Sequence, residues 1–441
     1  MSKKILFLIL AVFMVLAGCS SQNTGNEGNT GSGTSVAPKA SKEEKITLRY
    51  MSSEATDVAY VNKVVEEYQK INPNVNVEVN ILPGTDAFIT ALKAKFSADD
   101  APDFYSFQVG ARTQEFAEAG LILDLKGDPL LQNFNEKDLE LVSSNGGIYA
   151  APKNVQAVGT FLNMELFKKY KIEPPTNFTE MLEVNEAFRK NGIEYPIIMA
   201  GKDVNIVASP DFQYLSTVVI PNDADYYKKI LAGELHFNSP FIEQLFTKYG
   251  QLREYMSPDS LGVDADEAIK RLVRGDGAML MSGTWLLAQI RTYGPDLDLS
   301  IIPSTFQDNT EDRVLNVGVT NGYHVASTTE HPEEVKRFLE FMLTPEMGNL
   351  YAVETKQISA TKGVTAVADP ALEALVPWLD SDNKTPHADL IWIPGIKDVM
   401  KEVTQKWFLG EDIQTVLNEW EDRHQRLMKE NPSFVENFGK E

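Results

Sequence analysis

The chain is poor in the side chains that hold transition metals or form disulfides. Its 441 residues include one Cys and five His. A lone thiol forms no internal disulfide. The His residues are scattered, and the sequence lacks an H-E-x-x-H pattern, a P-loop, a G-x-S-x-G turn and a G-x-G-x-x-G opening a helix after a strand. We therefore predict no metal, no cofactor and no catalytic group.

Basic residues are also scarce. The chain carries 41 Lys and Arg against 63 Asp and Glu, a formal net charge of -22. This charge repels nucleic-acid phosphates and disfavours both electrostatic contact with a membrane surface and a highly anionic ligand. The length suffices for two or three domains, and a hydrophobic content of 43% indicates a large soluble core.

The longest apolar run lies at the amino terminus. Lys3 and Lys4 precede residues 5–16, which are too few to span a bilayer as a permanent helix. This pattern is typical of a signal peptide, which we place at residues 1–18. The run ends in Leu-Ala-Gly-Cys19, which resembles the lipobox of bacterial lipoproteins. The alternative is an ordinary secretory signal with an incidental Cys.

The lipobox resemblance implies that the chain is cleaved before Cys19, which is then diacylated (a palmitate-type anchor). Residues 19–45 are rich in Ser, Asn, Gly and Thr and nearly free of apolar residues. Such a segment buries too little surface to fold, so we predict a flexible tether. These features predict a protein of the Gram-positive type that a lipid anchors at the extracellular face of the cell membrane, without a spanning helix.

Beyond the tether, strand-like and helix-like segments alternate. Alternating apolar residues predict strands near 46–50 and 75–81, and helical spacing predicts a helix near 57–71. Asp57 is expected to cap that helix. The alternation predicts an α/β fold with helices on both faces of a mixed sheet. In such a sheet, ligands contact the loops that follow the strands.

Residues 268–290 read AIKRLVRGDGAMLMSGTWLLAQI and combine a helix, a buried strand and a second helix. Gly275 is suited to the left-handed end of the first helix, and 278–281 is the apolar strand. Trp285 follows Gly283, so its ring can lie flat against a ligand at the end of the strand. The alternative is that Trp285 belongs to the core of the second helix.

Several segments resemble the family 1 extracellular solute-binding proteins, the sugar-capturing components of bacterial ABC importers. They are Gly-x-Ala-Met followed by Gly-x-Trp, the Pro102-Asp103 that precedes a third expected strand at 104–107, FAEAGLILDL, and G-x-x-Y-x-x-P followed by TFLNMELF. The resemblance implies a two-lobed periplasmic-binding-protein-like fold, in which each lobe is a mixed sheet flanked by helices and a hinge joins them. We expect lobe 1 at 46–153 and 319–352, and lobe 2 at 154–318 and 353–441.

The positions after strands and at the hinge supply the candidate ligand-binding residues. They are Ser53, Glu54, Gln108, Arg112, Asn154, Gln156, Asp203, Trp285, Asn321 and Trp392. Several have a structural alternative: a helix cap or solvated charge for Ser53 and Glu54, a surface ion pair for Arg112, and hinge hydrogen bonds for Asn154 and Gln156. For Trp392 the alternative is a buried anchor for the C-terminal helices, and Trp407 and Trp420 are expected in the core.

Together these features predict a monomeric binding lipoprotein, not an enzyme, that captures a carbohydrate between two lobes and delivers it to an ABC permease. An aromatic face would cover the C–H side of a sugar ring, and polar groups would pair its hydroxyls. Two alternatives stay open. One is a surface-tethered carbohydrate-active enzyme with two carboxylates, such as Glu54 and Asp203. The other is a sugar sensor that signals to a membrane receptor.

Overall fold

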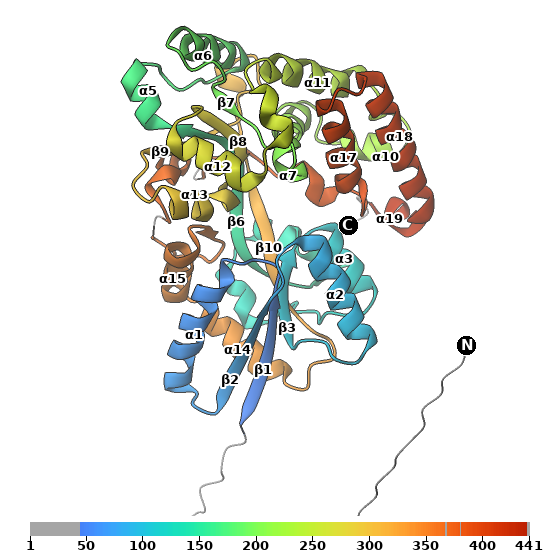
Figure 1. Ribbon diagram of the computed structural model, residues 1–441. Coiled ribbons are helices and arrows are strands. Elements are labelled where there is room, and N and C mark those ends of the chain that lie inside the picture. Colours follow the sequence, from blue (N-terminus) through green and yellow to red (C-terminus); the bar gives the residue numbers. More distant parts are fainter. Residues whose placement is uncertain (1–44, 367, 380, 439–441) are drawn as a thin grey trace, which may run out of the picture. The chain divides into compact units, whose positions relative to one another are not determined.

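The computed structural model of the protein describes residues 45–438, apart from residues 367 and 380. The predicted signal peptide, Cys19 and the tether as far as residue 44 lie outside the described residues. The described residues form one compact unit. Its central feature is a mixed sheet with the strand order β2-β1-β3-β10-β6-β8-β7 (Figure 1). The strands belong to two lobes, as predicted.

The first lobe is built on parallel strands. β1 (Ile46–Ser52) lies between β2 (Val75–Ile81) and β3 (Phe104–Gln108) and pairs with both in parallel. Parallel strands need crossover helices, which cover the sheet here. The helices of this lobe are α1 (Asp57–Ile71), α2 (Thr85–Ser97), α3 (Ala111–Glu118), α4 (Glu136–Glu140), α14 (Pro332–Met342) and α15 (Pro345–Thr355). A short hairpin, β4 (Ser143–Ser144) and β5 (Gly147–Ile148), completes it.

Two long antiparallel strands join the lobes. They are β6 (Ala151–Asn163) and β10 (Leu315–Val325). One end of β10 pairs with β3 of the first lobe, while the far end of β6 pairs with β8 (Met279–Gly283) and β9 (Leu299–Pro303) of the second. The β6–β10 register shifts around Asn321, which marks an irregularity where the chain passes between the lobes. A third short strand, β11 (Ile358–Ser359), also pairs with β6.

The second lobe adds short strands and most of the helices. The strands are β7 (Ile197–Ile198), β8, β9 and β12 (Lys384–Thr385). The helices are α5 (Met164–Tyr170), α6 (Phe178–Lys190), α7 (Val204–Val207), α8 (Ser209–Tyr214), α9 (Ile220–Asn222), α10 (Tyr226–Leu231), α11 (Pro240–Arg253), α12 (Ala265–Arg274), α13 (Leu287–Tyr293), α16 (Val376–Leu379), α17 (Ile396–Phe408), α18 (Ile413–Glu430) and α19 (Pro432–Asn437).

Local chemistry explains the element ends around β8. The Asp264 carboxylate accepts the backbone N–H of Glu267 and caps α12, and Gly275 ends that helix in the left-handed conformation. Asp57 does not cap α1 as expected. It is the first residue of the helix, and its carboxylate is buried against Lys153. The long-range ion pair replaces the local cap.

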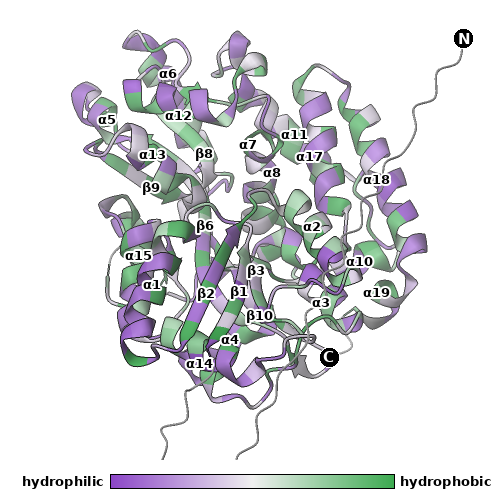
Figure 2. Cartoon of the chain, turned by 60° about the horizontal axis from the view of Figure 1, so that its bottom comes forward, coloured by the Kyte–Doolittle hydropathy of each residue, from purple (hydrophilic) through white to green (hydrophobic). Residues whose placement is uncertain are grey.

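Each lobe has its own apolar core. One cluster fills the second lobe and includes Trp392, Trp407 and Trp420, while three smaller clusters of described residues lie in the first lobe. In Figure 2 many helices carry both hydrophobic and hydrophilic residues, as expected for helices with one face against a core. The core position of Trp407 and Trp420 is confirmed. The predicted lobe boundaries stay a prediction.

Candidate functional site

A cavity of about 630 Å³ lies where the two lobes meet. Residues at the ends of β1 and β3 contribute from the first lobe, and residues after β8 and at the start of α17 contribute from the second. Ligands of α/β sheets collect at such strand ends. Its lining residues are Ser53, Glu54, Pro83, Gly84, Gln108, Gln156, Val158, Asp203, Asn205, Ile206, Phe212, Ala265, Trp285, Leu286, Gln289, Thr320, Asn321, His387, Asp389 and Lys397.

Most of the residues predicted from the sequence meet in this cavity. The structure brings together Ser53, Glu54, Gln108, Gln156, Asp203, Trp285 and Asn321. The other three predicted residues, Arg112, Asn154 and Trp392, are not among the described residues that line it. A ligand role for the first seven stays a prediction that their position supports.

Trp285 supplies a half-buried aromatic surface. It lies in the turn η4 (Thr284–Leu286) directly after β8, and its ring folds back over Gly283. A Cβ atom at position 283 would lie 1.9 Å from Cζ3 of the Trp285 ring. The glycine is therefore required for this ring orientation. Phe212 and Leu286 add apolar surface to the same cavity.

Glu54 joins the cavity to a buried charge cluster. Its Oε2 atom contacts the Lys153 ammonium, which also lies 2.6 Å from Oδ2 of Asp57. Burial raises the pKa of the Glu54 carboxyl, Lys153 opposes that rise, and Asp57 adds to it, so the net pKa lies above the ordinary value. For Lys153, burial acts to lower the pKa, but the two carboxylates raise it above its ordinary value.

Asn154 is committed to the hinge and not to the cavity. Its side chain is fully buried, and its amide donates to Oε1 of Gln357 at 2.5 Å and to the Tyr351 hydroxyl at 3.0 Å. Its carbonyl accepts the backbone N–H of Asn321 at 3.1 Å. Gln156, two residues along the same strand, does line the cavity and also donates to Gln357, at 3.2 Å.

Trp392 is placed in the core of the second lobe. It is 1% exposed, and its indole N–H donates to the Tyr226 hydroxyl at 2.6 Å. This is the buried-anchor alternative, and it corrects the expectation of an aromatic wall at this position. Arg112 lies on α3, outside the cavity lining described above.

Asp203 caps a helix at the rim of the cavity. Its Oδ1 atom accepts the backbone N–H groups of Asn205 and Ile206 at 2.9 and 3.0 Å. The cap fixes the carboxylate at the amino terminus of α7. Asp203 therefore caps a helix and also lines the cavity.

Sequence reasoning missed a polar group at the far side of the cavity. Asp389, in the turn η7 (Ala388–Ile391), lies 2.5 Å from the Lys397 ammonium and accepts a hydrogen bond from Gln108 of the first lobe at 3.4 Å. Burial acts to raise the pKa of Asp389, but Lys397 and His387 outweigh it and lower the net pKa. The His387–Pro394 segment was nominated for its Trp, whereas its acidic residue faces the cavity.

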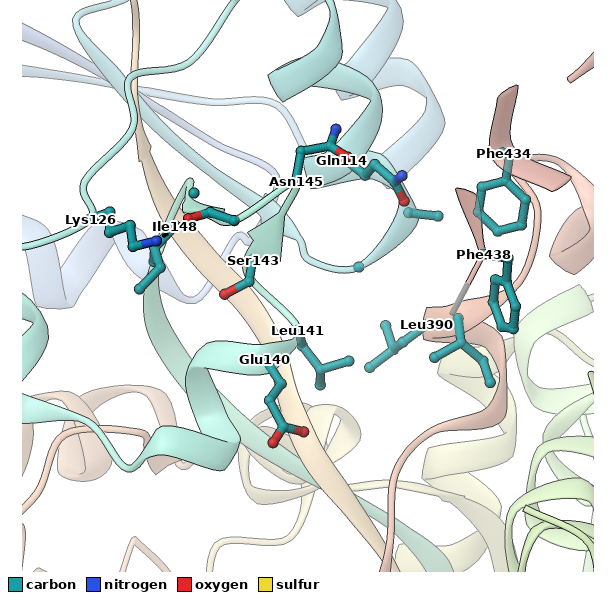
Figure 3. Close-up of a pocket in the computed structure, with 15 residues that line it drawn as sticks. Gln114, Lys126, Glu140, Leu141, Ser143, Asn145, Ile148, Leu390, Phe434 and Phe438 are labelled. Atoms are coloured by element: carbon teal, nitrogen blue, oxygen red, sulfur yellow. Dashed lines mark hydrogen bonds between the residues drawn. The ribbon is translucent and has the colours of Figure 1, made fainter. Parts of the chain in front are cut away.

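A second hollow, of about 820 Å³, lies beside the first. Figure 3 shows Phe434 and Phe438 at one end and Lys126 and Ile148 at the other. Gly110 and Leu390 line this hollow, whereas Gln108 and Asp389 line the first cavity. A Cβ atom at position 110 would lie 2.4 Å from the carbonyl oxygen of Leu390, so backbone of one lobe touches backbone of the other here.

The described residues contain no group of three or more His, Cys, Asp or Glu side chains arranged to hold a metal ion. Among these residues, no helix combines the length and the apolar character needed to cross a membrane. The cavity offers an aromatic surface, amide and hydroxyl groups, carboxylates, one imidazole and one ammonium group. These groups suit a ligand with apolar faces and hydroxyl groups.

A comparison with protein families decides the family. The family described as "Bacterial extracellular solute-binding protein" matches residues 52–349, more than half of the chain. The chain belongs to this family. The resemblance inferred from the sequence is confirmed. The matched range covers both long strands that join the lobes and all of the lining residues except those near the carboxyl end.

Relatives of this solute-binding protein have low sequence identity to it, but the similarity extends over most of both chains. The melibiose/raffinose/stachyose-binding protein MelE of Bacillus subtilis is 24% identical, over 93% of this chain and 92% of its own length. The multiple sugar-binding protein of Streptococcus mutans is 22% identical, over 78% of this chain and 82% of its own length. Both are named as binding proteins.

Solved structures show the same fold. The SBP RafE in complex with raffinose matches with a TM-score of 0.74 and 20% identity, covering 87% of this chain and 99% of that chain. A chitin oligosaccharide binding protein matches with a TM-score of 0.74 and 22% identity, covering 87% and 98%. The two-lobed α/β fold of the solute-binding proteins is confirmed.

Proposed function

We propose that the protein is the substrate-binding lipoprotein of a bacterial ABC importer and that it captures a carbohydrate in the cavity between its lobes. The observation that carries this proposal is the Trp285 ring at a cavity that polar groups of both lobes also line. An indole face covers the C–H side of a sugar, while carboxylates and amides pair its hydroxyls. The names of the relatives support the same ligand class.

Binding without catalysis is supported by the way in which the carboxylates of the cavity are engaged. Glu54 is paired with Lys153, Asp389 with Lys397, and Asp203 caps α7. Contacts from both lobes favour the closed arrangement, because a ligand shifts an equilibrium only through its differential affinity. The closed form would then dock on the permease as a monomer. The enzyme and sensor alternatives have no observation in their favour here.

A thermal-shift screen tests the function. A ligand that binds only the native state raises its melting temperature. The panel contains raffinose, stachyose, melibiose, xylo-oligosaccharides, arabino-oligosaccharides and chitin oligosaccharides. We expect at least one of them to raise the melting temperature, without release of reducing sugar on long incubation. No shift with any saccharide would contradict the carbohydrate assignment, and sustained turnover would replace binding with catalysis.

A further inference from the structure

A buried lysine holds the carboxylate that the first lobe presents to the cavity. Lys153 stands on β6, and its ammonium contacts Glu54, lies 2.6 Å from Asp57 and donates to the Ser106 hydroxyl at 3.3 Å. The side chains of Lys153 and Asp57 are 0% exposed, whereas that of Glu54 is 15% exposed. Only the carboxylate of this ion pair therefore reaches the cavity.

The second oxygen of Glu54 is also oriented. Its Oε1 atom accepts the amide N–H of Asn154 at 3.3 Å and that of Gln357 at 3.4 Å. Asn154 lies on β6, and Gln357 directly precedes β11, which pairs with β6. The carboxylate is thus held by Lys153, Asn154 and Gln357, none of which is among the described residues that line the cavity.

We propose that Lys153 is the positioning residue that keeps the Glu54 carboxylate ionised and aimed at the cavity, so that the site accepts hydrogen bonds from ligand hydroxyls and rejects anionic saccharides. An ionised carboxylate is acceptor-only and makes stronger hydrogen bonds than a neutral carboxyl. Without Lys153, Glu54 and Asp57 would be two like charges in a buried site, and one would take a proton. The inference rests on the proposed function.

The other charges of the cavity agree with this ligand class. Carboxylates of Glu54, Asp203 and Asp389 line it, and among the described lining residues the basic side chain is Lys397, which Asp389 already neutralises. A sugar carboxylate or phosphate would face this acidic wall without a free cation. Hydroxyl groups, or the ammonium of an amino sugar, would meet acceptors.

The other titratable groups around Lys153 are tyrosines. Tyr50, Tyr60, Tyr323 and Tyr351 surround the cluster, from β1, α1, β10 and α15. Burial raises the pKa of each above its ordinary value, so they stay neutral through the neutral range. A titration seen near neutral pH in this cluster therefore belongs to a carboxyl group.

Carbon-13 NMR of carboxyl-labelled glutamate tests the positioning role without any ligand. The Glu54→Gln variant assigns the Glu54 signal. Lys153→Met alone would leave two carboxylates, Glu54 and Asp57, without their cation. The main variant is therefore Asp57→Asn/Lys153→Met, in which the cluster has the same net charge as in the wild type. The matched control is Lys248→Met/Asp308→Asn, which removes an ion pair of 2.6 Å outside the cavity. We expect the Glu54 titration to move up by at least about one pH unit in the main variant only. An unmoved titration would overturn the proposal.

Affinity for raffinose, as the probe, provides the second readout. For the wild type and the control, the affinity should stay constant from about pH 6 to about pH 8. For the main variant, the affinity should increase as the pH rises, by up to roughly tenfold per pH unit, because Glu54 ionises over this range. A flat profile in the main variant would overturn the role of the charge.

Trigalacturonate tests the rejection of anionic saccharides. It should leave the melting temperature of the wild type unchanged, and a shift equal to that with raffinose would overturn the rejection of anions. If the wild type binds no saccharide, the proposed function fails, and the NMR titration decides the role of Lys153 alone.

Discussion

At the scale of single residues, the cavity depends on side chains whose orientation is set by close neighbours. Trp285 can lie against Gly283 only because that position has no side chain. His324, by contrast, is fully buried in the first lobe, where it stacks on Phe107 at a centroid distance of 4.1 Å and shares a hydrogen bond of 3.0 Å with Thr113. Both arrangements lead to a measurable expectation.

Trp285→Ala should weaken saccharide binding at least about tenfold, because the aromatic surface of the cavity is lost. The melt should remain cooperative, since Trp285 is half-buried at the rim of the core. Titration calorimetry with the saccharide identified in the thermal-shift screen measures the effect. Trp378→Ala is the matched control, since Trp378 stands outside the cavity lining. Unchanged affinity would remove Trp285 from the site.

His324 should make the protein less stable in acid. Burial lowers the pKa of His324 to about 3, while an unfolded chain has an ordinary His value near 6.5. The unfolded state therefore binds the proton first, and stability is lost as the pH falls from about 6.5 towards 3. We expect a loss of about 2 kcal/mol between about pH 7 and about pH 5, from urea unfolding.

His324→Gln provides the comparison for this pH dependence. Glutamine can still bond Thr113 but does not titrate, while the carboxyl groups and His424, whose pKa burial lowers to about 4, are common to both proteins. The slope of stability against pH should be shallower in the variant. Identical slopes in the two proteins would show that His324 is not the group involved.

At the scale of elements, the sequence predicts where helices and strands begin and end better than it predicts which of their side chains face the cavity. The end of α12 at Gly275 and the strand that precedes Trp285 were predictable, because capping chemistry and apolar runs are local signals. Asn154 and Gln156 lie two residues apart on one strand and were both assigned to the cavity. Both amides donate to Gln357, which is about 200 residues further along the chain, but the hydrogen bond from Asn154 is shorter than the one from Gln156. Only Gln156 lines the cavity.

The misassigned faces share one physical cause. The sequence predicted a cavity role for Trp392, directly after the turn η7, but Tyr226 of α10 holds that indole in the core, and Asp389 within the turn lines the cavity instead. Asp57 was expected to cap its own helix, yet its partner Lys153 is 96 residues away. Such partners come from tertiary packing, which no local pattern encodes.

The contact between Gly110, directly before α3, and Leu390 in η7 also belongs to this scale. Gly110 has φ +86°, and a side chain there would collide with Leu390 across the lobes. Gly110→Ala should hold the lobes apart on this side and weaken saccharide binding by roughly tenfold, as measured by calorimetry. Gly410→Ala is the control, because Gly410 has φ +112° but no described heavy atom within 4 Å of the added Cβ. Equal affinities of the two variants would argue against the contact.

At the scale of the whole molecule, a folded unit of two lobes follows a segment whose sequence predicts lipidation at Cys19. Two acyl chains on one residue give durable membrane anchoring. Cys19→Ser should therefore move the protein from the membrane fraction to the medium when cells are fractionated. Saccharide affinity should not change, because the cavity lies within residues 53–397. Continued sedimentation of the variant with membranes would contradict the anchor.

The order of strands has a consequence for how the protein is made. β10 lies between β3 and β6, although it follows both by more than a hundred residues of chain. A growing polypeptide thus cannot finish the first lobe until the residues between β6 and β10, which form the larger part of the second lobe, have left the ribosome. Until then, open sheet edges stay available for wrong pairing. If the chain is exported unfolded and folds outside the cell, all of its strands are available when folding begins.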